Sequence, residues 1–78
     1  MEQQFFIIEL QHRDDGIINQ VITAKNTRSS ALSYYYERKS KMLMTTLYTK
    51  VAVMVTDSDL SVIEQDVLET LYQAQPAE

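Results

Sequence analysis

Apolar and polar positions alternate along two early segments of the chain, and a short polar stretch separates them. Residues 4–11 and 17–24 are rich in β-branched and aromatic side chains, which is typical of strands. Between them, Asp15-Gly16 is a strong hairpin signal because both residue types tolerate a positive φ. The pattern therefore predicts an antiparallel hairpin.

A period of three to four residues replaces the alternation in the middle of the chain. The apolar stripe consists of Leu32, Tyr35, Tyr36, Leu43 and Leu47. Asn26 or Thr27 can cap a helix that begins near Arg28. We expect this helix to pack Leu32, Tyr35 and Leu43 against a sheet and to leave Tyr34 nearer to solvent.

The C-terminal third allows two interpretations. Residues 49–56 form the most apolar segment and predict a central strand. Beyond it, Leu60, Ile63, Val67 and Leu71 recur at helical spacing, whereas Asp57-Ser58-Asp59 could instead turn the chain into a fourth strand over residues 61–69. Residues 73–78 are expected to fray.

The order of these elements resembles that of small uncharacterised proteins of phages and prophages of Gram-positive bacteria. The motifs that carry the resemblance are Ala31-Leu32, Tyr35-Tyr36 and the Val51–Val55 run, and it covers residues 4–69. In such proteins the last segment looks like a strand after a turn that commonly holds glycine, where this chain has Asp59-Leu60. Together with the periodicity, the resemblance favours one α+β domain over residues 1–78 with the order β-β-α-β-β and an ordered core of about residues 3–72. The order β-β-α-β-α is the alternative.

The size of the chain predicts self-association. A domain of 78 residues without cysteine has no disulfide to support it, and it buries only about 60% of its unfolded surface. One helix can cover one face of a small sheet. We therefore expect Phe5 and Ile7, which alternate with Phe6, Ile8 and Leu10, to form a second apolar face that makes a homo-oligomer, with a dimer favoured.

The location expected for the protein is the cytoplasm, which would be the host cytoplasm for a phage-encoded chain. The apolar run from Phe5 to Ile8 is too short for a signal peptide or for a membrane span of about 20 residues. We therefore expect no membrane association.

Charge is divided unevenly along the sequence. Residues 25–50 hold six cations against the single acid Glu37, whereas residues 1–24 sum to −3 and residues 51–78 to −6, within a net charge of −4. An uneven distribution of charge of this kind affects which partners a protein binds and does not determine its fold. We expect two candidate partner-binding patches, one of Tyr34, Arg38 and Lys41, and one of Asp57, Asp59, Glu64 and Asp66.

Residues that could carry catalysis are sparse. His12 lies near Asp14 and Asp15, but a solvated hairpin explains these residues as well as a metal or proton-transfer site does. The C-terminal carboxylates lack the spacing and glycine of a calcium loop. We expect neither an enzyme nor a bound metal or cofactor.

Two functions follow as hypotheses. The first is a non-enzymatic interaction protein that binds a protein partner, and the resemblance implies a phage accessory role or inhibition of a host enzyme or defence system. The alternative is nucleic-acid binding through the basic helix, although the net charge of −4 and pI near 4.8 oppose it.

Overall fold

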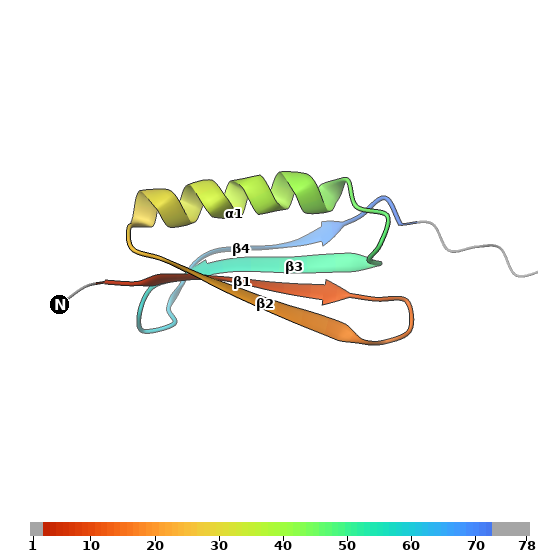
Figure 1. The fold of residues 1–78 in the computed structure, drawn as a ribbon, viewed down its shortest axis with the longest axis horizontal. Helices are drawn as coiled ribbons and strands as arrows, with labels where there is room; N and C mark the ends of the chain where they lie inside the picture. Colours follow the sequence, from red (N-terminus) through yellow and green to blue (C-terminus); the bar gives the residue numbers. More distant parts are fainter. Residues whose placement is uncertain (1–2, 73–78) are drawn as a thin grey trace, which may run out of the picture.

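The computed structural model describes residues 3–72 and contains five elements in the order β-β-α-β-β, which confirms the predicted α+β fold. They are β1 (Phe5–His12), β2 (Ile18–Lys25), α1 (Arg28–Leu43), β3 (Lys50–Thr56) and β4 (Val62–Glu69). Figure 1 shows α1 lying along one face of the sheet. The residues expected to fray, 73–78, fall outside the described range.

The sheet is antiparallel throughout, with strand order β2-β1-β3-β4. Strands β1 and β3 are therefore central, as the apolar composition of residues 49–56 predicts. Residues 62–69 are a strand, which resolves the open alternative in favour of the second hairpin. The β1–β2 and β3–β4 turns lie at opposite ends of the sheet (Figure 1).

Local side-chain chemistry determines where these elements begin. Gly16 has a φ of +90° in the first turn, and Asp15 Oδ1 accepts the Ile17 N–H at 3.0 Å. Thr27 is the N-cap of α1, and its hydroxyl accepts the Ser30 N–H at 3.1 Å. The predicted hairpin and cap are both present.

The core lies between α1 and the sheet face formed by the odd-numbered residues of β1 and β3. Its buried apolar residues are Phe5, Ile7, Ala31, Tyr35, Val51, Val53, Val55 and Leu68. The assignment of Phe5 and Ile7 to self-association was therefore wrong, because both side chains lie under the helix. The even-numbered residues Phe6, Ile8 and Leu10 face away from it.

The helix buries a narrower stripe than its sequence predicts. Tyr35 is buried as expected, and the small Ala31 allows a close approach to the sheet. Leu32 is partly buried against the core, whereas the expectation for Leu43 was wrong, since this side chain is 43% exposed. In the last turn of α1, Met42 rather than Leu43 packs against the core.

The β3–β4 turn holds a leucine in a backbone conformation that favours glycine. Leu60 has a φ of +64°, and its N–H donates to the Asp57 carbonyl at 3.1 Å. Left-handed φ costs an L-residue roughly 1–2 kcal/mol because Cβ crowds the carbonyl oxygen. Leu60 thus occupies a position where glycine would be unstrained.

Neighbouring isoleucines on β1 test which face of the sheet is covered. Ile7→Ala is expected to lower the free energy of unfolding by about 2–5 kcal/mol, because it leaves a cavity in the core. Ile8→Ala, on the opposite face, should cost clearly less. Urea titrations of both variants at low micromolar concentration measure this difference, and a larger loss in Ile8→Ala would contradict the assignment.

Substitutions at Leu60 test the strained turn. Leu60→Gly should raise the free energy of unfolding by about 0.5–1 kcal/mol, since relief of strain exceeds the added chain entropy. Leu60→Val should lower it, because a β-branched residue tolerates positive φ poorly. Thermal melts that showed Leu60→Gly to be the less stable of the two would exclude this backbone conformation.

Candidate interaction surfaces

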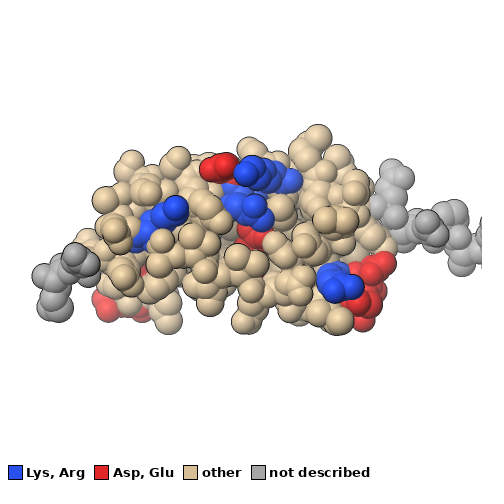
Figure 2. Space-filling view, in the orientation of Figure 1, with Lys and Arg blue, Asp and Glu red and all other residues tan. Residues whose placement is uncertain are grey.

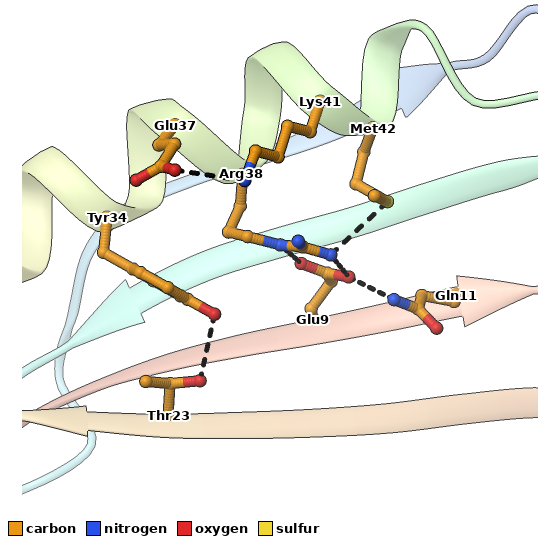
Figure 3. Close-up of polar contacts among 8 residues, drawn as sticks. All are labelled: Glu9, Gln11, Thr23, Tyr34, Glu37, Arg38, Lys41 and Met42. Carbon is orange, nitrogen blue, oxygen red and sulfur yellow. Dashed lines mark hydrogen bonds and ion pairs between the residues drawn. The ribbon is translucent and has the colours of Figure 1, made fainter.

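A buried ion pair joins the middle of α1 to the central strand β1. The Glu9 side chain lies on the helix-facing side of the sheet, where the residue is 2% exposed. Arg38 Nε donates to Glu9 Oε1 at 2.8 Å and Arg38 Nη2 donates to Glu9 Oε2 at 2.9 Å, so the contact is bidentate (Figure 3). Gln11 Nε2 also donates to Glu9 Oε2, and Arg38 Nη2 lies 3.8 Å from Met42 Sδ. Arg38 thus directs its Nε and Nη2 groups at the buried Glu9 rather than at solvent.

The environment of Glu9 favours its charged form. Burial alone would raise the pKa of the carboxyl, but hydrogen bonds from Arg38 and Gln11, together with the Arg38 charge, lower that pKa below its ordinary value. The hydrogen bond to Glu9 correspondingly raises the pKa of Arg38. The sequence presented Arg38 as a partner-binding cation, whereas the structure uses it to neutralise a buried acid.

The three consecutive tyrosines are divided differently from the sequence prediction. Tyr34 leans toward the sheet, where its phenol oxygen accepts a hydrogen bond from Thr23 Oγ1 at 3.3 Å (Figure 3). Lys25 Nζ lies 4.9 Å from the centre of the Tyr34 ring. Tyr36, expected in the buried stripe, is instead 49% exposed. Tyr34 and Tyr36 therefore exchange the roles assigned to them.

A second set of polar contacts ties α1 to the edge strand β4. The Tyr36 hydroxyl lies 2.8 and 2.7 Å from the two Glu64 oxygens, and the pKa of Tyr36 is raised by this hydrogen bond. Lys39 Nζ pairs with Asp66 Oδ2 at 3.1 Å, which lowers the pKa of Asp66 and raises that of Lys39. Two of the four predicted acidic partner-binding residues, Glu64 and Asp66, thus belong to the helix–strand contact.

The remaining two acids lie in the β3–β4 turn. Asp57 Oδ1 accepts the N–H groups of Asp59 at 2.9 Å and Ser61 at 3.0 Å, so this carboxylate holds the turn together. Asp59 is exposed. Both acids border a hollow of about 330 Å³, which Arg28 and Ile63 also line.

On the outer surface of α1, charge is also paired. Lys41 Nζ lies 3.1 Å from Glu37 Oε1, one helical turn earlier, and both side chains are more than half exposed (Figure 3). In Figure 2, one group of Lys and Arg side chains lies over the helix beside an acid, other cations lie toward the left and at the lower right, and further acids lie toward the two ends of the molecule. The predicted basic patch therefore separates into Tyr34 and Arg38, which face the sheet, and Lys41, which faces solvent.

The sheet face away from α1 has no element of the described chain packed on it. Cross-strand pairing places two uncharged rows at its centre, each with three apolar residues and one glutamine: Ile22, Ile8, Met54 and Gln65, and then Gln20, Leu10, Ala52 and Val67. We call this surface the open face. Ile22 is 63% exposed and Val67 is 62% exposed, although both are apolar. The sequence predicts a surplus of apolar strand residues at Phe5 and Ile7. The exposed apolar face instead contains Ile8 and Leu10, on the opposite side of β1.

The described residues 3–72 contain no group of three or more His, Cys, Asp or Glu side chains that could hold a metal ion. His12 lies in the end row of the open face, between Ile18 and Lys50 on the neighbouring strands. No helix in this part of the chain is both long and apolar enough to cross a membrane.

Comparison with known proteins adds no relative. No protein-family model, curated protein or solved structure matches the chain. The resemblance to phage proteins, and the role that it implies, therefore stay predictions.

The buried ion pair predicts a specific dependence of stability on pH. Because the folded-state pKa of Glu9 lies below its ordinary value of 4.5, its carboxylate stabilises the fold above that pH. This contribution is lost as the pH falls through the folded-state pKa. Glu9→Gln should lower the free energy of unfolding at pH 7 by about 1–3 kcal/mol and should flatten the decline of stability below pH 5.

Glu37→Gln provides the matched control for this experiment. It removes an acid from an exposed helical ion pair with Lys41, which contributes no more than about 0.5 kcal/mol. Chemical denaturation of both variants between pH 3 and pH 7, bracketing the ordinary Glu9 pKa of 4.5, measures the two profiles. Equal losses of stability in Glu9→Gln and Glu37→Gln would show that the buried pair is not coupled to folding.

Proposed function

We propose that the protein is a small non-enzymatic interaction protein whose acidic β3–β4 turn binds a basic surface on a protein partner. The supporting observation is the pairing of charge within the fold. Three of the four cations on α1, Arg38, Lys39 and Lys41, have carboxylate partners within 3.1 Å. The fourth cation, Arg28, lines the hollow beside Asp57 and Asp59, but among the described residues neither of these two acids forms an ion pair.

The turn is suited to such a contact because its backbone is already ordered. Asp57 accepts two backbone N–H groups, and Asp57 N–H in turn donates to the Ser61 carbonyl at 3.0 Å. An ordered loop loses less entropy on binding than a free one. Asp59, exposed on this turn, can then contribute long-range attraction and increase the association rate.

Nucleic-acid binding receives less support from the same contacts. Phosphate binding needs cations that can exchange counterions for phosphate oxygens. Arg38 is committed to the buried Glu9, and the exposed Lys41 has Glu37 within 3.1 Å. A phosphate at Lys41 would therefore meet a carboxylate of the same sign.

The resemblance to phage proteins extends the proposal to the origin of the partner. A host protein with a basic, nucleic-acid-binding surface is the partner class that an acidic turn would occupy. Inhibition of a host enzyme or of a defence system would follow from blocking that surface. This extension rests on the resemblance, whereas the sign of the partner's surface rests on the charges described above.

Reversal of charge at Asp59 tests the proposal. Asp59→Lys should reduce capture of basic partner proteins from a nuclease-treated lysate of a Gram-positive bacterium about tenfold, equivalent to about 1.4 kcal/mol. Asp57 is left unchanged because its carboxylate holds the turn. Quantitative mass spectrometry of the captured proteins at low and high salt provides the measurement.

Asp14→Lys is the matched control, because it makes the same change of charge in the hairpin turn at the opposite end of the sheet. The Asp14→Lys substitution removes an exposed hydrogen bond that the Tyr72 hydroxyl donates to the Asp14 carboxylate. Capture by this variant should equal that of the unmodified protein. Equal capture by all three proteins would refute the proposal, as would a low-salt gel shift of DNA or RNA that Asp59→Lys strengthened.

A further inference from the structure

The open face differs from the rest of the surface in both composition and shape. Its central residues are apolar or uncharged, and a shallow hollow of about 250 Å³ lies over β1, β3 and β4. The small Ala52 forms part of this hollow, with Ile8, Leu10 and Met54 around it. The more exposed Ile22 and Val67 stand on the flanking edge strands.

Charge on this face is confined to one end. Among the described residues that the pairing places here, charged side chains occur in the final row, where Lys50 lies opposite Glu69. His12 pairs with Lys50 in the same row. An apolar centre with a polar rim is the arrangement of a protein interface, in which charged residues are depleted from the core.

The dimensions of the face match those of a stable dimer interface. Four strands spaced about 4.8 Å apart and about eight residues long span roughly 19 by 26 Å, or about 500 Å² in projection. The accessible area of a corrugated surface exceeds its projection, so the face approaches the roughly 800 Å² per partner of a standard interface. The largest apolar patch on a typical monomer is roughly 300–600 Å² and often marks an interaction site, and the open face reaches at least this range.

We infer that the open face binds the open face of a second copy, giving a two-fold symmetric dimer in which two sheets stack and both helices lie outside. Two sheets packed face to face lie about 10 Å apart with their strands roughly aligned. Such an isologous contact requires a surface that complements itself. A centre without charge meets this requirement because no like charges are brought together.

A second copy also explains the shape of the surface. Val67 borders the hollow around Ala52, and the exposed Ile22 stands on the opposite edge strand. When the face is turned onto itself, the exposed edge side chains of each copy can contact the hollow of the other. Burial of these side chains supplies the stability that one helix and one half-covered sheet provide poorly in a chain of 78 residues.

The mass of the full chain in solution tests the inference. Light scattering coupled to size exclusion should give twice the 9.1 kDa of the monomer at about 100 µM, well above the Kd expected for such an interface. Ile22→Glu and Val67→Glu should each halve that mass, because either places a carboxylate in the apolar contact. Both sites are so exposed that the folded monomer should retain its circular dichroism spectrum.

Leu47→Glu is the control for adding a charge at an exposed apolar site. Leu47 is 72% exposed in the loop between α1 and β3, and this variant should remain dimeric. A monomeric unmodified protein would overturn the inference, and so would a dimer that both open-face variants left intact. Neither result bears on the acidic turn, whose test uses different residues and a different readout.

Thiol labelling keeps the inference testable if a glutamate variant fails to fold. The chain has no cysteine, so each variant carries a single thiol whose labelling rate measures the exposure of one site. Gln65→Cys places this thiol on the open face, and Ser40→Cys places it on the outer surface of the helix. Maleimide should modify Gln65→Cys several-fold more slowly at 100 µM protein than at 1 µM protein, because the dimer buries this site. It should modify Ser40→Cys at the same rate at both protein concentrations. Equal rates for Gln65→Cys at both concentrations would exclude the dimer.

Discussion

A carboxylate buried beneath the helix determines which side of the sheet the rest of the chain can cover. Glu9 lies in the middle of β1, and its charge can be held there because Arg38 reaches down from α1 to form two short hydrogen bonds with it. Truncation of Arg38 would leave the buried carboxylate without its counterion and with Gln11 as its side-chain donor. The pair therefore fixes the helix over Phe5, Ile7 and Gln11 rather than over Phe6, Ile8 and Leu10.

This arrangement leaves the two layers of the domain unequal. One side of the sheet receives α1 with its ion pairs, and the other keeps an apolar surface whose central residues carry no charge. The acidic turn lies at the end of the sheet, away from the centre of both faces. A dimer formed through the open face would thus leave two copies of the turn accessible, which would allow a repetitive partner to be bound at two points.

Local signals in the sequence, namely alternation, the Asp15-Gly16 turn and the Thr27 cap, were sufficient for the first hairpin, the helix and the third strand. They left residues 61–69 open between strand and helix, and the order β-β-α-β-β was favoured only together with the resemblance. Which face of β1 the helix covers could not be predicted, because alternation divides a strand into two faces without showing which of them is buried. Glu9 lies on the same side as Phe5 and Ile7, and the guanidinium that allows its burial comes from 29 residues away, so no local pattern marks this side as the one under the helix. Periodicity likewise could not separate Tyr34 from Tyr36, since their positions depend on Thr23 and Glu64 in other elements.

The position of β1 beside β3 has a consequence for how the chain folds. Each hairpin closes through a short turn, but β1 and β3 pair across β2, α1 and their connecting segments, from Phe6 with Thr56 to His12 with Lys50. Closing this long loop costs entropy before the central pairing can repay it. We therefore expect the two hairpins to form early and their docking along β1 and β3 to be slower. Before docking, each hairpin would present an unpaired edge that the finished sheet conceals at its centre, and such an edge can pair with other chains. The native hydrogen bonds between β1 and β3 thus remove a site at which the nascent chain could aggregate.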